Sequence, residues 1–341
     1  MFQVYATTPE TMGPKEIIAH AQRAEAMGYD GLHVPDAVHD GLLLAAMALN
    51  ATTQLKVGTA VLVAFPRSPM SVAVAAWDLQ GMSNGRFELG LGTQIKQNIE
   101  QRYSTPWSAP VPRMREYIGS LRAIFDSFQN GNKLNYVGEH YQFTRLQPFF
   151  NPGPLDSGPP PIYMGAVGPL MTALAGEASD GMITHPTNTP PRYIREVAVP
   201  RLQKGADKLG RSVSDVKLIL GSLVATGKDA TALAASREKQ RQLLGFLYST
   251  PSYWPSLELF GWQDRGEKLQ QLTREGRWQD MASVVDDEML DTFVPSGKYD
   301  EIAGILTQRY AGLSSIINFP LPDDPQDDVR ASEAIAGLKH P

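Results

Sequence analysis

Eight short, mostly apolar segments recur along this chain, and helix-like stretches separate nearly all of them. Strands that alternate with helices form parallel sheets, and eight of them favour a (β/α)8 TIM barrel over the alternative, a doubly wound sheet. A minimal barrel needs about 250 residues. We therefore predict one TIM-barrel domain over 1–341, with insertions at about 101–160 and 229–290. The expected strands lie near 2–6, 31–34, 57–63, 86–91, 162–165, 181–184, 217–224 and 314–319.

Local signals predict the helices between these strands. Pro14 suits the first turn of one helix, and Gly28 follows its expected end. Asp40 is placed to cap the next helix, because its carboxylate can accept hydrogen bonds from the first backbone N–H groups. The other elements expected in the N-terminal half are helices over 69–81 and 113–128 and a hairpin over 134–143.

Composition excludes several classes of function. The chain has no cysteine, so disulfides, a thiolate nucleophile, a cysteine zinc site and an iron–sulfur cluster are all excluded. Lys and Arg number 31 against 36 Asp and Glu, and this acidic balance argues against nucleic-acid and membrane partners. The longest apolar runs, 42–49 and 60–65, fall far short of the ~20 residues that cross a bilayer. Residues 1–15 lack a signal-peptide pattern, so we expect a cytoplasmic protein with a small-molecule substrate.

In a TIM barrel the chemistry lies at the carboxyl ends of the strands. Small residues follow several of the strands expected here, and they let backbone N–H groups approach a phosphate or a flavin closely. Polar side chains stand at the same ends. The residues in question are Asp36 and His39 after the second strand, Arg67 after the third, Gly92 and Thr93 after the fourth, Gly165–Gly168 after the fifth, and Thr184 and His185 after the sixth.

Other catalytic motifs are missing from the sequence. No histidine or carboxylate pair has the H-E-x-x-H spacing, so we predict no metal. The run 90–96 matches neither a dinucleotide-binding nor a P-loop pattern, and there is no G-x-S-x-G elbow of a serine hydrolase. We find no buried lysine at a strand end, which argues against a barrel lyase or aldolase.

Four stretches that follow one another in order resemble the bacterial luciferase-like superfamily, and within it the F420-dependent oxidoreductases. The resemblance extends over essentially residues 1–320 and implies a TIM barrel that binds the deazaflavin F420, or in the alternative FMN, across the strand ends. It also implies a non-proline cis peptide bond, which maps to Ala60–Val61. The four stretches are Gly-Thr-Ala-Val at 58–61, Ser-Asn-Gly-Arg-Phe-Glu-Leu-Gly-Leu-Gly-Thr at 83–93, Gly-Ala-Val-Gly-Pro at 165–169 and Asp-Gly-Met-Ile-Thr at 180–184.

The resemblance also suggests roles for individual residues. Sugar-phosphate dehydrogenases of this group have a histidine where this chain has Ala37 and a carboxylate where it has Ile95. We therefore reject a sugar substrate and expect His39 to be the proton donor. The predicted catalytic residues are Asp36, His39 and His185, and the predicted substrate contacts are Arg67 and Trp107. The predicted cofactor-binding residues are Asp36, Ala60, Val61, Gly92, Thr93, Gly165, Ala166, Val167, Gly168, Thr184 and His185.

Each of these side chains also has a structural interpretation. Asp36 could cap a turn, His39 could be a solvated loop residue, and His185 could make only a local hydrogen bond. Arg67 could pair with a helix carboxylate, and Trp107 could be a packing residue. The histidine within the second strand, at position 33, is expected in the core with one hydrogen bond.

The sequence thus predicts an oxidoreductase that transfers a hydride between F420 and an unidentified organic substrate. An FMN-dependent monooxygenase of the same superfamily is the first alternative, and a flavin- or deazaflavin-binding protein without turnover is the second. The resemblance also implies a homodimer, formed through the helices beside the second and third strands.

Overall fold

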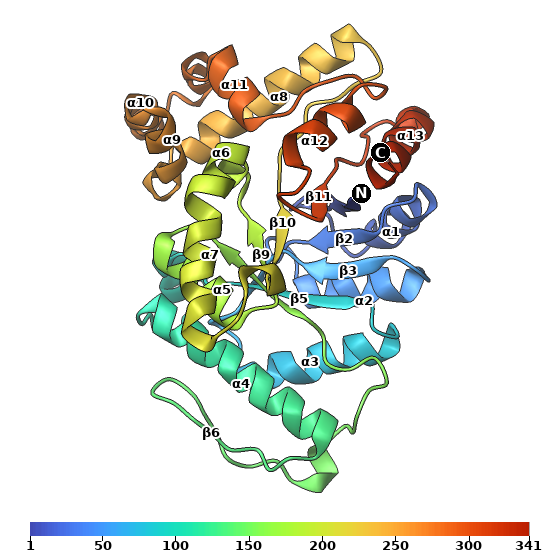
Figure 1. The fold of residues 1–341 in the computed structure, drawn as a ribbon, viewed down its shortest axis with the longest axis vertical. Coiled ribbons are helices and arrows are strands. Elements are labelled where there is room, and N and C mark those ends of the chain that lie inside the picture. The colour runs from blue at the N-terminus through green and yellow to red at the C-terminus, as the bar shows by residue number, and fades with distance from the viewer. Residues whose placement is uncertain (341) are drawn as a thin grey trace.

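The computed structural model describes residues 1–340, and its central sheet is a closed parallel barrel (Figure 1). The strand order is β3-β2-β1-β11-β10-β9-β8-β5-β4, and a further pairing of β3 with β5 closes the sheet. Because β3 and β4 are two parts of the third barrel strand, eight parallel strands form the ring, and the predicted TIM barrel is confirmed. The strands are β1 (Gln3–Thr7), β2 (Gly31–Val34), β3 (Lys56–Thr59), β4 (Leu62–Val63), β5 (Phe87–Gly92), β8 (Ile162–Ala166), β9 (Gly181–Thr184), β10 (Lys217–Leu220) and β11 (Ile316–Asn318).

Helices surround the barrel in the order that the sequence predicts. Asp40 caps the second helix as expected, because its carboxylate accepts the N–H groups of Leu42 and Leu43 at 3.0 Å. The first helix begins at Ile17 rather than Pro14, and the Glu16 carboxylate accepts a hydrogen bond within the turn that precedes it. The ring consists of α1 (Ile17–Ala26), α2 (Gly41–Ala51), α3 (Pro69–Met82), α4 (Pro110–Asn130), α5 (Pro169–Ala178), α7 (Val199–Ala206), α12 (Ile302–Tyr310) and α13 (Asp328–Lys339), with the short α6 (Pro191–Tyr193) before α7. Among residues 1–340, no helix is both long and apolar enough to span a membrane.

The segment 101–160 contributes a ring helix as well as a projection. Its helix α4 packs between α3 and α5, so it takes the place of the barrel helix after β5. The rest includes the predicted hairpin, β6 (Tyr136–Val137) and β7 (Gln142–Phe143), which extends away from the barrel beneath α4 (Figure 1). Glu116 of α4 accepts backbone N–H groups of the hairpin turn, including that of His140 at 2.7 Å, and this fixes the hairpin to the ring.

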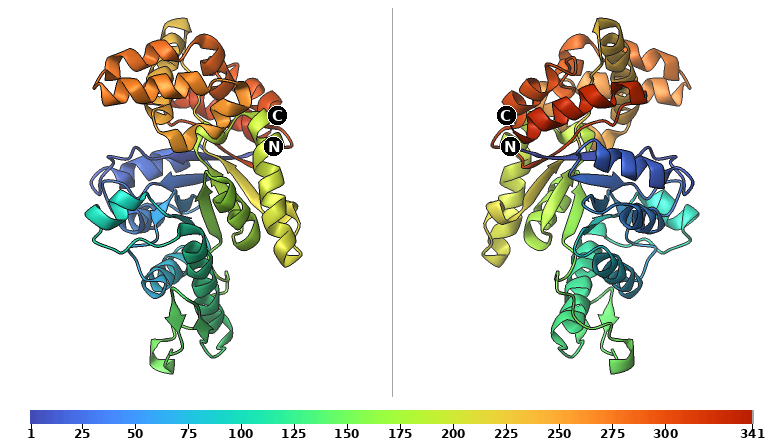
Figure 2. Two further views of the ribbon diagram at one scale, coloured as in Figure 1. Left: turned by 90° about the vertical axis from the view of Figure 1, so that its left-hand side faces the viewer. Right: turned by 90° about the vertical axis from the view of Figure 1, so that its right-hand side faces the viewer.

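The segment 229–290 is helical and packs around a core of its own at the opposite end of the molecule (Figures 1 and 2). Its helices are α8 (Ala230–Tyr248), α9 (Pro255–Phe260), α10 (Gln263–Arg274) and α11 (Asp287–Phe293). The buried side chains of this core include those of Leu244, Tyr248, Leu257, Leu269, Met289 and Phe293. The segment follows β10, so it lies after the seventh strand of the barrel.

Side chains fill the inside of the barrel. Buried Tyr5, Tyr163, Ile183, Ile219 and Ile316 pack together there, and Ala60 and Val61 lie against them. The barrel is therefore a packed core and not a channel, and any ligand has to bind where the strands end.

Candidate active site

The end of the third barrel strand brings four of the predicted residues together. The peptide bond Ala60–Val61 is cis, as the resemblance implied, and it separates β3 from β4. The side chain of Val61 lies against Gly92 and Gly165: a Cβ on Gly92 would come within 2.5 Å of Val61 Cγ2, and one on Gly165 within 3.0 Å of Cγ1. Larger residues would not fit beside Val61, so the two glycines shape this part of the barrel end.

The loop after the fifth strand leads directly into α5. Gly168 is the N-terminal cap of that helix, and a Cβ placed on it would meet no atom within 4 Å. Ala166 is buried in the core between barrel and helices, so its backbone rather than its side chain is available to a ligand. Neither Gly165 nor Gly168 has a positive φ, so their conformation alone does not require glycine. The free N–H groups at the start of a helix attract anions, and this loop could hold a phosphate.

Asp36, at the end of the second strand, is bonded on every side. Its carboxylate accepts the N–H of Val63 at 2.9 Å and the N–H of Gly41 at 3.1 Å. It also accepts both terminal nitrogens of Arg67, at 2.8 and 3.3 Å. Only 5% of its side chain is exposed. These contacts fasten the loop after β2 to the chain after β4, which is a structural role for Asp36.

The partners of Arg67 are likewise all within the protein. Besides Asp36, its guanidinium donates to Asp40 at 2.8 Å and to the carbonyl of Val63 at 3.0 Å. Burial opposes ionisation of Asp40, but hydrogen bonds from Leu43 and Arg67 outweigh it and hold the pKa of Asp40 below its usual value. The structure therefore supports the carboxylate-pairing interpretation of Arg67 over substrate contact.

Trp107 packs against a neighbouring aromatic ring. Its ring meets that of Phe65 edge to face, with centroids 5.9 Å apart, and the guanidinium of Arg113 lies 4.4 Å from the Phe65 centroid. The tryptophan is only half-buried, so the packing role that the structure shows leaves one part of its surface open to a ligand.

His39 and Thr93 are half-buried and make no side-chain hydrogen bond within residues 1–340. His39 lies beside the loop after β1, because a Cβ on Gly13 would come within 3.1 Å of His39 Nε2. The loop that carries His39 also accepts a hydrogen bond from Arg102, through the carbonyl of Ala37 at 2.6 Å. The histidine is therefore not committed to a structural partner, which keeps it available as a proton donor.

The sixth strand ends in a buried threonine and a half-buried histidine. Thr184 Oγ1 accepts the N–H of Gly221 at 3.0 Å and so joins the ends of β9 and β10. The ring of His185 stacks on Tyr253 with centroids 4.1 Å apart and planes 9° apart, and its Nδ1 lies 2.8 Å from Thr187 Oγ1. Burial lowers the pKa of His185 to about 4, so the imidazole is neutral near pH 7.

Sequence reasoning missed two polar groups at the strand ends. The hydroxyls of Thr8, after β1, and Ser222, after β10, are buried and have no hydrogen-bond partner. We expected the seventh strand to run through 224, which placed Ser222 inside the strand. β10 ends at Leu220, so Ser222 lies in the loop that follows it. Unpartnered buried hydroxyls are costly, and at the carboxyl end of a barrel they fit a bound cofactor whose polar atoms would satisfy them.

The histidine inside the second strand behaves as the sequence suggests. His33 is buried, and its Nδ1 lies 3.2 Å from Asn318 Oδ1 of β11. Burial lowers the pKa of His33 to about 4, so it is a neutral member of the core.

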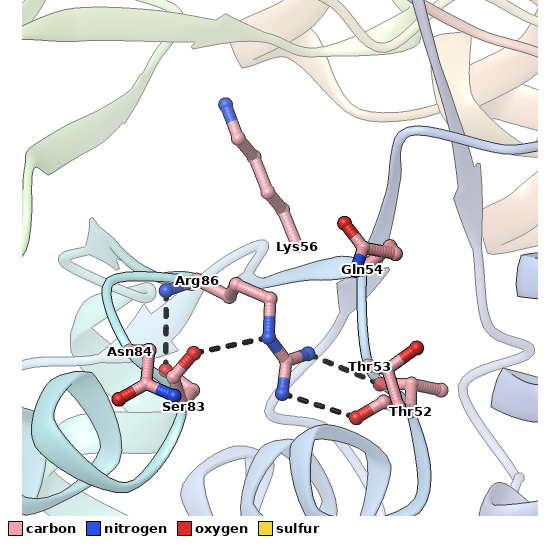
Figure 3. A pocket seen from close by; sticks show the side chains of 7 residues that line it. All are labelled: Thr52, Thr53, Gln54, Lys56, Ser83, Asn84 and Arg86. Atoms are coloured by element: carbon pink, nitrogen blue, oxygen red, sulfur yellow. Dashed lines mark hydrogen bonds between the residues drawn. The ribbon is translucent and has the colours of Figure 1, made fainter.

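Two surface pockets lie at the other end of the barrel. The pocket in Figure 3 is lined by residues that precede or begin strands β3 and β5, among them Lys56 and Arg86. The nitrogens of Arg86 donate to the carbonyls of Leu49, Thr52, Leu55 and Ser83 and to the hydroxyl of Thr52, which leaves none for a ligand. The second pocket involves 159–161, just before β8. Residues 1–340 contain no group of three or more His, Asp or Glu side chains placed to hold a metal ion.

A closed barrel with glycines, hydroxyls and histidines gathered at the carboxyl ends of its strands defines the class of (β/α)8-barrel enzymes. The family model described as luciferase-like monooxygenase matches residues 2–314. The chain belongs to the luciferase-like monooxygenase family, and the resemblance seen in the sequence is confirmed.

Individual relatives extend this assignment. An uncharacterised protein of Mycobacterium tuberculosis is 41% identical over 303 residues, which cover 88% of this chain and 89% of that protein. An F420-dependent glucose-6-phosphate dehydrogenase of Nakamurella multipartita is 30% identical over 236 residues, or 66% of this chain and 68% of that one. The structure of an F420-dependent tetrahydromethanopterin reductase from Methanopyrus kandleri has a TM-score of 0.79 at 19% identity, covering 99% and 97% of the two chains.

Proposed function

We propose that this protein is an oxidoreductase that transfers a hydride between coenzyme F420 and a small organic substrate. The observation that carries the proposal is the carboxyl end of the barrel, where Gly92 and Gly165 surround Val61 and the hydroxyls of Thr8 and Ser222 have no partner. The relative from Nakamurella multipartita, which is named for its dependence on F420, supports the choice of cofactor.

The residues at the strand ends have distinct tasks in this proposal. F420, when bound, supplies the hydride chemistry. Gly92, Thr93, Val61 and the backbone of Ala60 would contact its ring system, and the loop 165–168 with the start of α5 would bind its phosphate. The unpartnered hydroxyl of Ser222 would accept or donate a hydrogen bond that it otherwise lacks.

We assign proton donation to His39 and a positioning role to Asp36. Asp36 holds the loop after β2 through its bonds to Val63, Gly41 and Arg67, and this loop carries His39. A positioned acid contributes roughly 10²–10⁴-fold to a reaction that needs a proton. Because the Asp36 carboxylate is fully bonded, it has no lone pair left for substrate, whereas His39 has no competing partner in residues 1–340.

The substrate in this proposal is not a sugar phosphate. Ala37 and Ile95 stand where the sugar-phosphate enzymes of the group carry a histidine and a carboxylate. Ile95 is exposed and apolar, so it offers no acid or base at that position. The half-buried ring of Trp107 is the best remaining candidate for contact with a substrate of apolar character.

Binding measurements with two cofactors test the proposal. Fluorescence titration of the protein with F420 and, separately, with FMN is expected to give the tighter dissociation constant for F420. Micromolar binding of FMN without binding of F420 would contradict the proposal and favour the FMN-dependent monooxygenase. Tight F420 binding without oxidation of the reduced cofactor by a panel of enones, quinones and nitro compounds would favour a non-catalytic binding protein.

We further propose that the protein forms a homodimer through α2 and α3. Both helices carry large apolar side chains on the surface: Leu43 is 54% exposed on α2 and Val74 is 42% exposed on α3. These helices follow the second and third barrel strands, which is where the sequence resemblance suggests an interface. Sedimentation velocity is expected to give twice the mass of the chain, and the double substitution Leu43→Glu with Val74→Glu is expected to give the monomer.

A further inference from the structure

His185 is held on two sides by groups from different parts of the chain. Its Nδ1 lies 2.8 Å from Thr187 Oγ1, and the backbone N–H of Thr187 donates to the same nitrogen at 3.4 Å. One face of its ring stacks on Tyr253, which belongs to the helical segment after β10. The loop itself is fixed from the same segment, because Tyr248 Oη donates to the carbonyl of Thr187 at 3.1 Å.

These contacts define which nitrogen of His185 carries the proton. A backbone N–H can only donate, so Nδ1 must present a lone pair to Thr187. The proton of the neutral ring is therefore on Nε2. Nε2 of His185 has no hydrogen-bond partner within residues 1–340. The same is true of Nε2 in His20 and His33, but those two atoms are buried and Nε2 of His185 is not. This N–H is thus open at the carboxyl end of β9.

The surroundings keep the ring neutral. Burial lowers the pKa of His185 to about 4, and burial also raises the pKa of Tyr253, so the stacked pair carries no charge near pH 7. No carboxylate or cationic side chain contributes to the shift. A neutral N–H stabilises negative charge that develops on an oxygen atom without first giving up its proton.

We infer that His185 is a catalytic hydrogen-bond donor through Nε2–H, that Thr187 and Tyr253 are its positioning residues, and that the substrate is a carbonyl compound whose oxygen accepts this bond. The inference rests on the proposed function and names the class of substrate. F420, when bound in its reduced form, would supply a hydride to the carbonyl carbon; the π electrons of the C=O bond would move to oxygen, and His39 would give a proton to the resulting alkoxide. His185 keeps its own proton throughout.

The role of the helical segment after β10 follows from this arrangement. Tyr253 and Tyr248 both come from that segment, and Trp254 Nε1 donates to the Tyr248 carbonyl at 2.8 Å. The segment therefore supplies the wall that orients and desolvates His185, and a change within it alters the donor without touching a strand end.

Nitrogen NMR of the imidazole rings, in the protein without cofactor, tests the positioning. We expect the Nε2–H tautomer for His185 and a pKa near 4. Tyr253→Ala is expected to move that pKa toward the ordinary value of 6.5, since it exposes the ring, whereas Tyr253→Phe keeps the stack and the low pKa. An Nδ1–H tautomer in the wild type, or an unchanged pKa in a folded Tyr253→Ala variant, would overturn the inference. If Tyr253→Ala does not fold, Thr187→Val is the second test: it removes the hydroxyl contact but keeps the backbone N–H that donates to Nδ1, so the Nε2–H tautomer must persist, and an Nδ1–H tautomer in this variant would overturn the inference.

A kinetic measurement tests the substrate class. The F420-loaded wild type is expected to reduce at least one of a panel of ketones, enones and quinones, and His185→Ala is expected to lower kcat/KM by roughly 10²–10³-fold. An enzyme that binds F420 but reduces none of the panel would overturn the carbonyl substrate. A protein that binds no F420 would overturn the proposed function instead. The NMR measurement would still determine the tautomer and the pKa of His185.

Discussion

Replacing Asp36 with asparagine separates its structural role from a catalytic one. The carboxylate accepts four hydrogen bonds, two of them from Arg67, and only 5% of its side chain is exposed. Asparagine keeps one oxygen, but its amide N–H groups must then face two donors, so two bonds are lost. A hydrogen bond that involves a charged group contributes about 1.5–3 kcal/mol, and a broken buried pair costs about 3–5 kcal/mol. We therefore expect Asp36→Asn to lower the free energy of unfolding by about 3–5 kcal/mol.

Asp40→Asn is the matched control for this measurement. Asp40 also accepts from Arg67 at 2.8 Å, but its side chain is 48% exposed, and asparagine caps a helix as well as aspartate does. An exposed ion pair contributes at most about 1 kcal/mol. Urea unfolding, followed by circular dichroism, should therefore show a large loss for Asp36→Asn and a small one for Asp40→Asn. Equal stability of the two variants would refute the structural role, and loss of turnover in a fully stable Asp36→Asn variant would restore the catalytic one.

Three further changes address the cofactor, the proton and the barrel interior. Gly168→Val should abolish F420 binding, because the valine side chain would occupy the open space at the start of α5. The melting temperature should not change, since that side chain meets no protein atom, and wild-type affinity would place the glycine outside the site. His39→Ala should lower turnover by roughly two orders of magnitude with little change in cofactor affinity, and full activity would exclude it as the proton donor. Burial raises the pKa of Glu88 above its unfolded value of 4.5, so the folded state binds this proton more tightly and stability is lost as pH rises. Glu88→Gln should therefore gain stability relative to the wild type as pH rises above 4.5, and a pH-independent difference in unfolding free energy would contradict this.

The barrel could be predicted because its signals are local. Apolar segments such as 57–63 and 86–91 predict buried strands without reference to the rest of the chain. Asp40 caps its helix by accepting hydrogen bonds from residues only two and three positions later. Errors arose where a distant contact ends an element. The seventh strand stops at Leu220 because the N–H of Gly221 donates a hydrogen bond to the hydroxyl of Thr184 on the neighbouring strand. No pattern within 217–224 indicates that contact.

In the candidate site, too, local patterns predict some features and contacts between distant residues determine the others. The sequence alone places Val61, Gly92 and Gly165 at strand ends, and parallel strands of a closed barrel necessarily bring those ends together. It could not decide between the roles open to Asp36, because the bonding partner Arg67 lies 31 residues away on another loop.

His185 depends on tertiary structure in the same way, since the ring that covers it, Tyr253, comes from a separate helical segment after β10. Strand order and helix caps follow from residues that are close in sequence, where spacing fixes geometry. The protonation and availability of a polar side chain depend on burial and on partners from distant segments, and only the packed structure determines these.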